Sequence, residues 1–331
     1  MLEVVLWLAV IPVGVAVMQW GASSAADLLE RIRDRFALPA TAGGALMGLA
    51  TASPETAVNV ASVAFGWPDL GLGAALGSNV PALPFAFGLA YLGGRYADRG
   101  RNRPSTISEG GTPTVRPQAV PVQVLPYLGI VLLLAVLTLP PAWAGLQPID
   151  GVILFLAWMA FFGRAVWRKP WRKQERSSAP LAARKAVLFG LPAVALGALA
   201  SVYAAQKVGI ALGWSDLVVG LFAIGFLCAL PESYSAFRFA RDGKPTLAVS
   251  GATADGIVSV SIALLPAAFI GATVGNYAVY VVNVGFLVAV LSLYAIINHR
   301  RHGQELGPKF VALFLGLYGG YIALMVWVLS A

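Results

Sequence analysis

The sequence predicts an all-α membrane protein in which ten transmembrane helices form two inverted five-helix repeats. Its 331 residues are 58% hydrophobic and 11% charged, with a mean hydropathy of +0.77. Soluble domains carry about a quarter charged residues. Apolar segments of about 20 residues recur along the chain, long enough to cross ~30 Å of hydrocarbon. A Pro-Glu pair also occurs at matching places in the two halves.

Ten apolar segments are expected to be helices, and none has the alternating pattern of a membrane β-barrel. They cover about residues 1–20, 37–65, 69–94, 122–142, 146–166, 187–209, 215–240, 245–271, 275–297 and 308–330. The first segment begins MLEVVLWLAV, without a basic n-region or a small-residue cleavage site. It is therefore expected to be a retained helix and not a cleaved signal peptide.

The basic residues predict the orientation in the membrane. All 23 Lys and Arg residues except Lys207 fall in loops that the ten segments place on one side. The positive-inside rule makes that side cytoplasmic and puts the N- and C-termini on the non-cytoplasmic side. This distribution is typical of membrane topology, so no nucleic-acid partner is expected, and the oligomeric state is left open. The absence of a targeting presequence favours a prokaryotic inner (plasma) membrane.

The chain is expected to divide into two repeats, residues 1–166 and 187–331, joined by a basic cytoplasmic linker over 167–186. A cytoplasmic loop over 95–121 is rich in Gly, Pro, Ser and Thr and is expected to be a mobile tether without a packed core. Because five is an odd number, the second repeat enters the membrane from the opposite side. Inverted repeats of this kind are common in secondary transporters.

The two halves carry similar motifs. Residues 50–55 read ATASPE and residues 227–232 read LCALPE, so helices 2 and 7 are expected to be broken by Pro-Glu. The next helix of each half carries a polar residue, Asn79 or Asp255, at nearly the same distance beyond the glutamate. The whole motif spans about residues 50–80 and 227–256. Small residues are expected to let these helices approach closely; they are Gly71, Gly73, Gly77 and Gly251.

The prolines expose backbone carbonyls at the same depth as the acids. Pro54 and Pro231 have no N–H, so the carbonyls of Ala50 and Leu227 lose their helical partners. A carbonyl left unpaired in hydrocarbon costs several kcal/mol. A bound cation can satisfy it.

The candidate ligands contain only oxygen, which suits a hard cation such as Ca²⁺ or Na⁺. The metal ligands predicted at this site are Glu55, Asn79, Glu232 and Asp255. His299 and His302 fall in the last cytoplasmic loop, which argues against a zinc site. Cys228 is the chain's single cysteine, so an internal disulfide and a multi-cysteine cluster are excluded. Its side chain is interpreted either as a small buried hydrophobe or as a thiol that lines the site.

These motifs resemble the two α-repeats of the calcium/cation antiporter superfamily, of the Na⁺/Ca²⁺-exchanger type. That family carries G-T-S-x-P-E on one helix and G-S-N or G-S-D on the next, and this chain has Gly-Ser-Asn ending at Asn79 and Thr-Ala-Asp ending at Asp255. The resemblance implies two interlocked five-helix repeats around a central Ca²⁺ site made by the four predicted ligands. It also implies flanking ion sites, for which the candidates are Ala50, Thr51, Ser78, Leu227 and Cys228.

The chain departs from the family pattern at its hydroxyl residues. Ser or Thr of the family is replaced by Ala52, Cys228, Ala229 and Ala254. Both Na⁺ and H⁺ are therefore candidate counter-ions, because a desolvated carboxylate binds a proton readily.

The expected function is secondary-active antiport of Ca²⁺, or a similar divalent cation, against Na⁺ or H⁺ by alternating access at a midplane carboxylate site. No enzymatic activity and no cofactor are expected. The alternatives are a divalent-cation/H⁺ exchanger without Na⁺ dependence and a passive cation channel. An intramembrane aspartyl protease would need two catalytic aspartates, whereas the matched acids are Glu55 and Glu232.

Overall fold

The computed structural model describes residues 2–35, 48–97, 106–108, 111–116, 120–140, 144–167, 186–299 and 304–330. The α-helices are α1 (Leu2–Arg35), α3 (Ser53–Ala64), α4 (Pro68–Ala97), α5 (Leu125–Thr138), α6 (Pro148–Trp167), α8 (Leu191–Leu212), α9 (Asp216–Val219), α10 (Phe226–Arg241), α11 (Pro245–Ser259), α12 (Leu265–Phe269), α13 (Tyr277–His299) and α14 (Pro308–Ser330). Three π-helical segments are η1 (Val120–Val124), η3 (Ala186–Gly190) and η4 (Gly220–Gly225). Two short strands, β1 (Thr114–Val115) and β2 (Gln304–Glu305), pair antiparallel.

Each of the ten predicted apolar segments contains helix. Within the described ranges, seven helical stretches are long and apolar enough to cross a membrane. They are Glu3–Leu29, Pro68–Ala97, Pro121–Thr138, Leu188–Leu212, Asp216–Arg241, Tyr277–Asn298 and Pro308–Ser330. The second and eighth predicted segments contain the shorter helices α3, α11 and α12. The number of ten crossings therefore stays a prediction.

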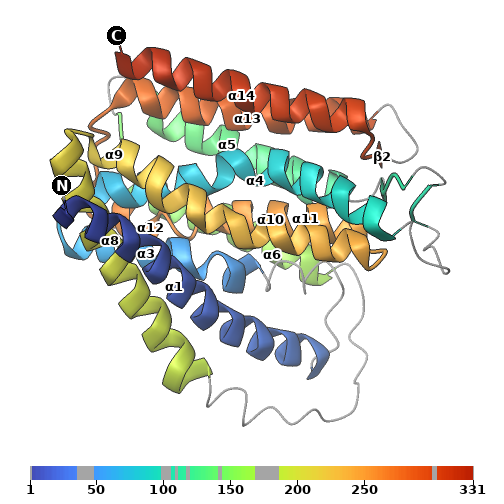
Figure 1. Cartoon of the computed structure of the whole chain (residues 1–331), viewed down its shortest axis with the longest axis horizontal. Helices are drawn as coiled ribbons and strands as arrows, with labels where there is room; N and C mark the ends of the chain where they lie inside the picture. The colour runs from blue at the N-terminus through green and yellow to red at the C-terminus, as the bar shows by residue number, and fades with distance from the viewer. Residues whose placement is uncertain are drawn as a thin grey trace.

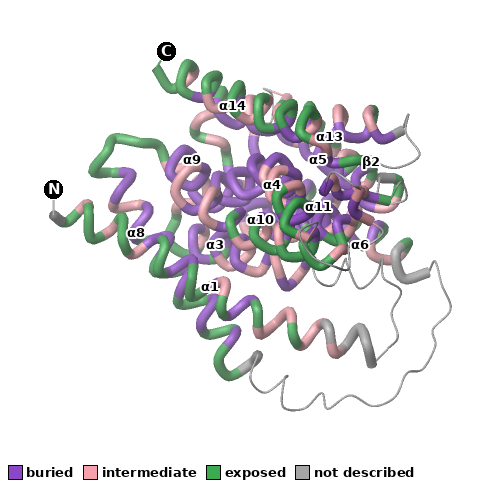
Figure 2. The backbone as a smooth tube through the Cα atoms, turned by 45° about the vertical axis from the view of Figure 1, so that its right-hand side comes forward, coloured by how far each residue is buried: buried purple, intermediate pink, exposed green. Residues whose placement is uncertain are grey.

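Helix α4 is the centre of the bundle. It is 94% buried over its apolar window and contacts α3, α10, α11, α13 and α14. Figure 1 shows α4 between α13 and α14 on one side and α1 and α8 on the other. In Figure 2 the buried residues gather around α4, α10 and α11. A helix surrounded by other helices needs small side chains so that its neighbours can approach closely, which explains the many Gly and Ala residues in α4.

Two glycines of α4 permit its close contact with the second half of the chain. A Cβ at Gly73 would collide with the carbonyl oxygen of Leu217, and one at Gly77 would collide with that of Leu221. The close approach expected at these positions is confirmed. The same expectation is wrong for Gly251, where an added Cβ would meet nothing within 4 Å.

The outer helices present apolar side chains to their surroundings. Helix α14 is only 22% buried over its apolar window, and α1 packs mainly against α8. Large apolar residues on these outer surfaces are exposed, for example Leu6, Leu196, Val326 and Trp327. Such a surface suits the hydrocarbon of a bilayer. Both termini lie at the same end of the bundle in Figure 1, and β2 lies at the other end.

The interruptions of the helices differ from the prediction. Helix α10 continues through Pro231 without ending, because one proline removes a single hydrogen bond and a kinked helix tolerates that loss. The irregular backbone lies earlier, in the π-helix η4. In the described part of the second predicted segment, residues 48–65, the helix is interrupted by a turn at Ala52 and not at Pro54. The eighth segment is broken between α11 and α12, which the sequence did not predict.

The cytoplasmic loop predicted over 95–121 is not wholly a tether. Within its described part, β1 pairs with β2, and the Thr106 hydroxyl donates to the carbonyl of Gly243 at 2.7 Å. Ile107 and Val115 are buried. These few apolar residues dock the loop on the ends of α10 and α11. The predicted basic linker over 167–186 falls almost entirely outside the described residues.

A substitution in α4 tests the close helix contact. We expect Gly77→Ala to destabilise the protein by about 1–3 kcal/mol, the usual effect of overpacking, because the new Cβ meets the Leu221 carbonyl. The measurement is the thermal unfolding temperature in detergent. The matched control is Gly285→Ala in α13, where a Cβ meets nothing within 4 Å. Equal unfolding temperatures for the two variants would contradict the contact.

Candidate functional site

Glu55 lies at the start of α3, just after the turn at Ala52. Pro54 occupies the first turn of α3, where the missing N–H leaves no helical hydrogen bond unmade. The Glu55 side chain is fully buried, and neither of its carboxylate oxygens has a hydrogen-bond partner. A buried carboxylate without donors is unfavourable unless a cation or a proton neutralises it.

The two carbonyls expected to be freed by proline differ in their surroundings. The Ser53 hydroxyl donates to the carbonyl oxygen of Ala50 at 2.7 Å, so this carbonyl has a partner. Leu230 stands at the corresponding position of the second half and has no hydroxyl to offer to Leu227. Of the two predicted backbone ligands, Leu227 therefore has the greater need of an outside partner.

The other two acids lie on α10 and α11. Asp255 is buried and Glu232 is half-buried. One oxygen of each, Oδ1 of Asp255 and Oε2 of Glu232, is buried without a hydrogen-bond partner. The carboxyl groups of Glu55, Glu232 and Asp255 are each near enough to the other two for direct electrostatic repulsion. The three predicted acids are thus brought together from both halves of the chain.

The predicted polar ligands of α4 lie beside these acids. The Ser78 hydroxyl neighbours the Glu55 carboxyl group and donates to the carbonyl of Ala75 at 3.1 Å. Asn79 donates through Nδ2 to the same carbonyl at 2.6 Å, and its Oδ1 accepts a hydrogen bond from the Tyr127 hydroxyl. Asn79 is 3% exposed. Its carboxamide is therefore held at both ends.

Two glycines show how the halves interlock. Gly48 and Gly225 precede Glu55 and Glu232 by the same number of residues. A Cβ at Gly48 would lie 2.6 Å from the carbonyl oxygen of Ala254, and one at Gly225 would lie 2.6 Å from that of Ala74. Each Pro-Glu helix therefore crosses the small-residue helix of the opposite half, as expected for a pair of inverted repeats.

The predicted secondary ligands Thr51 and Cys228 also lie at this crossing. The Thr51 hydroxyl neighbours the Asp255 carboxyl group and donates to the carbonyl of Gly48 at 3.3 Å. Cys228 is fully buried in an apolar cluster with Val58 and Leu70. It is also near enough to all three acids to interact with them electrostatically. Burial among apolar residues supports the interpretation of Cys228 as a small buried hydrophobe, and proximity to the acids supports its interpretation as a thiol that lines the site.

The acids do not already form a coordination shell. Among the described residues, no group of three or more His, Cys, Asp or Glu side chains is arranged as a ready-made metal site. The three carboxyl groups repel one another but do not converge on one point. Coordination of a single ion would require their side chains to rotate inward.

Several buried polar residues of this region escaped the sequence analysis. Asn59 and Ser62 follow Glu55 on one face of α3, and Asn59 donates to the carbonyls of Glu55 and Gly71, both at 3.1 Å. The Ser62 and Ser259 hydroxyls are buried without partners. The spacing of Glu55, Asn59 and Ser62 along a helix was a usable indication. No sequence pattern indicated a role for Tyr127, because α5 lies outside both motifs.

The family comparison covers nearly the whole chain. The model of the sodium/calcium exchanger protein family matches residues 6–167 and 186–327. An uncharacterized membrane protein of Methanocaldococcus jannaschii is 23% identical over 280 residues, which are 82% of this chain and 83% of that protein.

Solved structures of the sodium-calcium exchanger NCX_Mj have the same fold. One, soaked with 10 mM Na⁺ and zero Ca²⁺, matches with a TM-score of 0.64 and 22% identity over 97% of this chain and 99% of that chain. Another, soaked with 100 mM Na⁺ and 10 mM Sr²⁺, matches with a TM-score of 0.65 and 22% identity over 97% and 98% of the two chains.

Thiol labelling tests the position of Cys228. Because the side chain is fully buried and is the only cysteine, a maleimide should react slowly with the folded protein and rapidly after denaturation. We expect Ca²⁺ well above its Kd to slow labelling by about tenfold or more, since ligand binding suppresses opening. The readout is the mass of the labelled protein against time. Labelling that is fast and unaffected by Ca²⁺ would contradict the buried position of Cys228 beside the three acids.

Proposed function

We propose, since the chain belongs to the sodium/calcium exchanger protein family, that it exchanges Ca²⁺ or a similar divalent cation for Na⁺ or H⁺ by secondary-active antiport. One observation carries this proposal. Three buried or half-buried carboxyl groups, from both halves of a membrane bundle, repel one another and have oxygens without hydrogen-bond partners. The acids are Glu55, Glu232 and Asp255.

Charge balance is the physical argument for a cation substrate. One acid inside a membrane costs roughly 2.5–3.5 kcal/mol on the insertion scale, and repulsion raises that cost for three acids. A bound Ca²⁺ cancels two charges and satisfies several oxygens at once. Protons or Na⁺ ions can achieve a similar neutralisation. The site therefore favours being loaded with one kind of ion or the other.

The orientation of nearby donors supports direct ion ligation. The hydroxyls of Thr51 and Ser78 and the amide group of Asn79 each donate to a backbone carbonyl, and the two hydroxyls also lie within hydrogen-bonding reach of Asp255 and Glu55, respectively. A hydroxyl that donates elsewhere presents its oxygen lone pairs. We assign the primary ion ligands to Glu55, Asn79, Glu232 and Asp255. We assign secondary roles to Thr51, Ser78 and the Leu227 carbonyl.

Neutralisation also explains coupling by alternating access. An empty site with its acids ionised resists being closed off from water and moved past the apolar core. A loaded site is nearly neutral and can pass between its two access states. Return of the carrier then requires the counter-ion, so the two fluxes are linked and leak is suppressed.

The counter-ion is tied to the missing hydroxyls. Alanine replaces hydroxyl residues at Ala52, Ala229 and Ala254, which removes side-chain oxygens available to Na⁺. A proton needs no such shell, because a carboxylate binds it directly. This observation favours H⁺ exchange as the second form of the proposed function.

The orientation follows from the basic loops. We place the cytoplasm on the side of the strand pair, near Arg116 and Lys244, and both termini on the opposite side. A prokaryotic inner membrane is the proposed location. The repeats are proposed to be residues 1–166 and 187–331.

Neutral substitutions test the site. Glu55→Gln and Glu232→Gln should each reduce ⁴⁵Ca²⁺ exchange in proteoliposomes by about 100-fold or more, because loss of one buried charge partner costs ~3 kcal/mol. The matched control is Asp242→Asn, which removes an acid whose side chain is 53% exposed at the end of α10. Full activity of both glutamine variants would refute the site.

Imposed gradients identify the counter-ion. ⁴⁵Ca²⁺ uptake into proteoliposomes is measured with an outward Na⁺ gradient at equal pH, and separately with an outward H⁺ gradient in Na⁺-free buffer. Given the hydroxyl-poor motifs, we expect the H⁺ gradient to drive the larger uptake. Uptake that runs equally without either gradient would indicate a passive channel and contradict antiport.

A further inference from the structure

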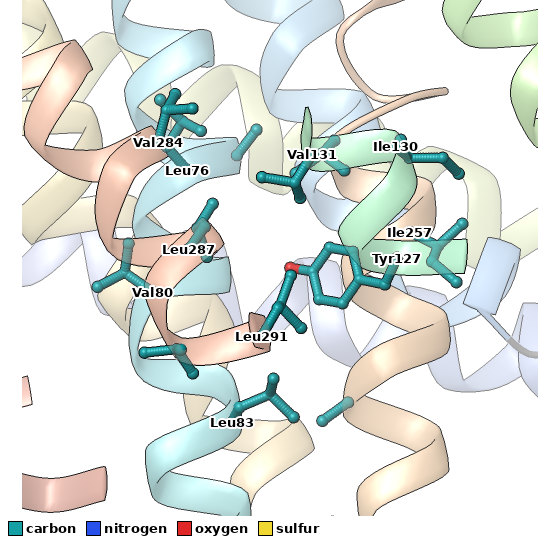
Figure 3. Close-up of a cluster of buried hydrophobic side chains, with 14 of the residues drawn as sticks. Leu76, Val80, Leu83, Tyr127, Ile130, Val131, Ile257, Val284, Leu287 and Leu291 are labelled. Carbon is teal, nitrogen blue, oxygen red and sulfur yellow. The ribbon is translucent and has the colours of Figure 1, made fainter. Parts of the chain in front are cut away.

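Tyr127 is a polar residue in an otherwise apolar environment. It lies near the start of α5, outside both Pro-Glu motifs, and its side chain is 1% exposed. Figure 3 shows its ring among buried aliphatic side chains of α4, α5, α11 and α13, with the hydroxyl pointing away from its own helix. The hydroxyl of a buried tyrosine usually has a hydrogen-bond partner.

The partner is one of the proposed ion ligands. The Tyr127 hydroxyl donates to Oδ1 of Asn79, whose Nδ2 donates to the Ala75 carbonyl at 2.6 Å. The ring also packs on Gly256, where a Cβ would lie 2.6 Å from the same Oδ1 of Asn79. Gly256 directly follows Asp255 in the chain. The Tyr127 phenol and the Asn79 amide therefore lie beside Asp255, which belongs to the other half of the chain.

The chemistry of a carboxamide makes its orientation important. Its oxygen can bind a cation, whereas its NH₂ group carries partial positive charge and repels one. Two hydrogen bonds, one at each end, fix the orientation of the Asn79 carboxamide, and its oxygen lies close to Gly256, the residue that follows Asp255. The oxygen has two lone pairs, so it can accept from Tyr127 and still bind an ion.

We propose that Tyr127 is a positioning residue of the ion site: it holds the Asn79 carboxamide with its oxygen toward the carboxylates and thereby raises affinity for the divalent cation. This inference rests on the proposed function. The hydroxyl acts through Asn79 and does not itself ligate the ion. Helix α5 thus contributes to the site from outside the repeated motifs.

The test compares two buried tyrosines whose hydroxyls each donate a hydrogen bond to an asparagine side-chain oxygen. Tyr127→Phe keeps the ring and removes the hydroxyl. The matched control is Tyr321→Phe, because Tyr321 is also buried and donates to an asparagine oxygen, Oδ1 of Asn283, at 2.8 Å in another part of the bundle. For each full-length variant in detergent, the Kd for ⁴⁵Ca²⁺ and the unfolding temperature without the ion are measured. Exchange in proteoliposomes gives KM and the maximum rate.

We expect Tyr127→Phe to raise the Kd and KM for Ca²⁺ about tenfold, equivalent to ~1.4 kcal/mol, with little change in maximum rate. Tyr321→Phe should leave both constants unchanged. An unchanged or lower Kd in Tyr127→Phe, or an equal rise in Tyr321→Phe, would overturn the inference.

An aspartate at position 79 tests the route through Asn79. The two oxygens of a carboxylate are equivalent, so Asn79→Asp needs no orienting hydroxyl. Adding Tyr127→Phe to Asn79→Asp should therefore leave the Kd unchanged, whereas a second tenfold rise would show that Tyr127 acts independently and overturn the proposal. If the unaltered protein binds no divalent cation at all, the proposed function itself fails. Equal Kd values for the unaltered protein and Tyr127→Phe would instead contradict only the role of Tyr127.

Discussion

Glu55, Glu232 and Asp255 lie close enough together inside the bundle for their carboxyl groups to repel one another. Charges of one sign are held together only if the surrounding packing prevents their separation or if an ion neutralises them. Here no donor from the described part of the chain pairs with either oxygen of Glu55. The hydroxyls of Thr51 and Ser78 and the Asn79 amide each have a backbone carbonyl as a hydrogen-bond acceptor. A cation that binds and dissociates would balance this charge, as the proposed function requires.

Close backbone packing creates the place for these charges. Helix α4 can occupy the centre because Gly73 and Gly77 let it contact the turns at Leu217 and Leu221 without side chains between them. Gly48 and Gly225 give the corresponding contact for the two Pro-Glu helices. Each glycine weakens a helix by roughly 1 kcal/mol relative to alanine. In a membrane, however, glycines permit the van der Waals contact that holds helices together. The glycines that let these helices make contact thus also help to fix the relative positions of the acids.

The two halves are similar without being equal. Ser53 donates to the carbonyl of Ala50, whereas Leu230, at the corresponding position of the second half, has no hydroxyl to donate to that of Leu227. Asn79 occupies the position at which the second half has Asp255, and only the Asn79 carboxamide has an orientation to be chosen. Tyr127 contacts this member of the pair. The two motifs are therefore similar in sequence but differ in the hydrogen bonds that their polar groups make.

The sequence by itself determined the class of protein, the helical segments, the two motifs and the family, because membrane length, apolar composition and Pro-Glu pairs are local properties of the chain. Its errors were also local in origin: Pro231 was expected to break a helix that continues, since neighbouring turns absorb one lost hydrogen bond. The loop over 95–121 was expected to lack a packed core, whereas in its described part β1 pairs with β2 and Ile107 is buried. Only the tertiary structure decided that Tyr127 reaches Asn79 and that Ser53 satisfies Ala50. Hydrogen-bond partners depend on distances of about 3 Å between atoms, and for Tyr127 and Asn79 no spacing along the chain encodes that distance.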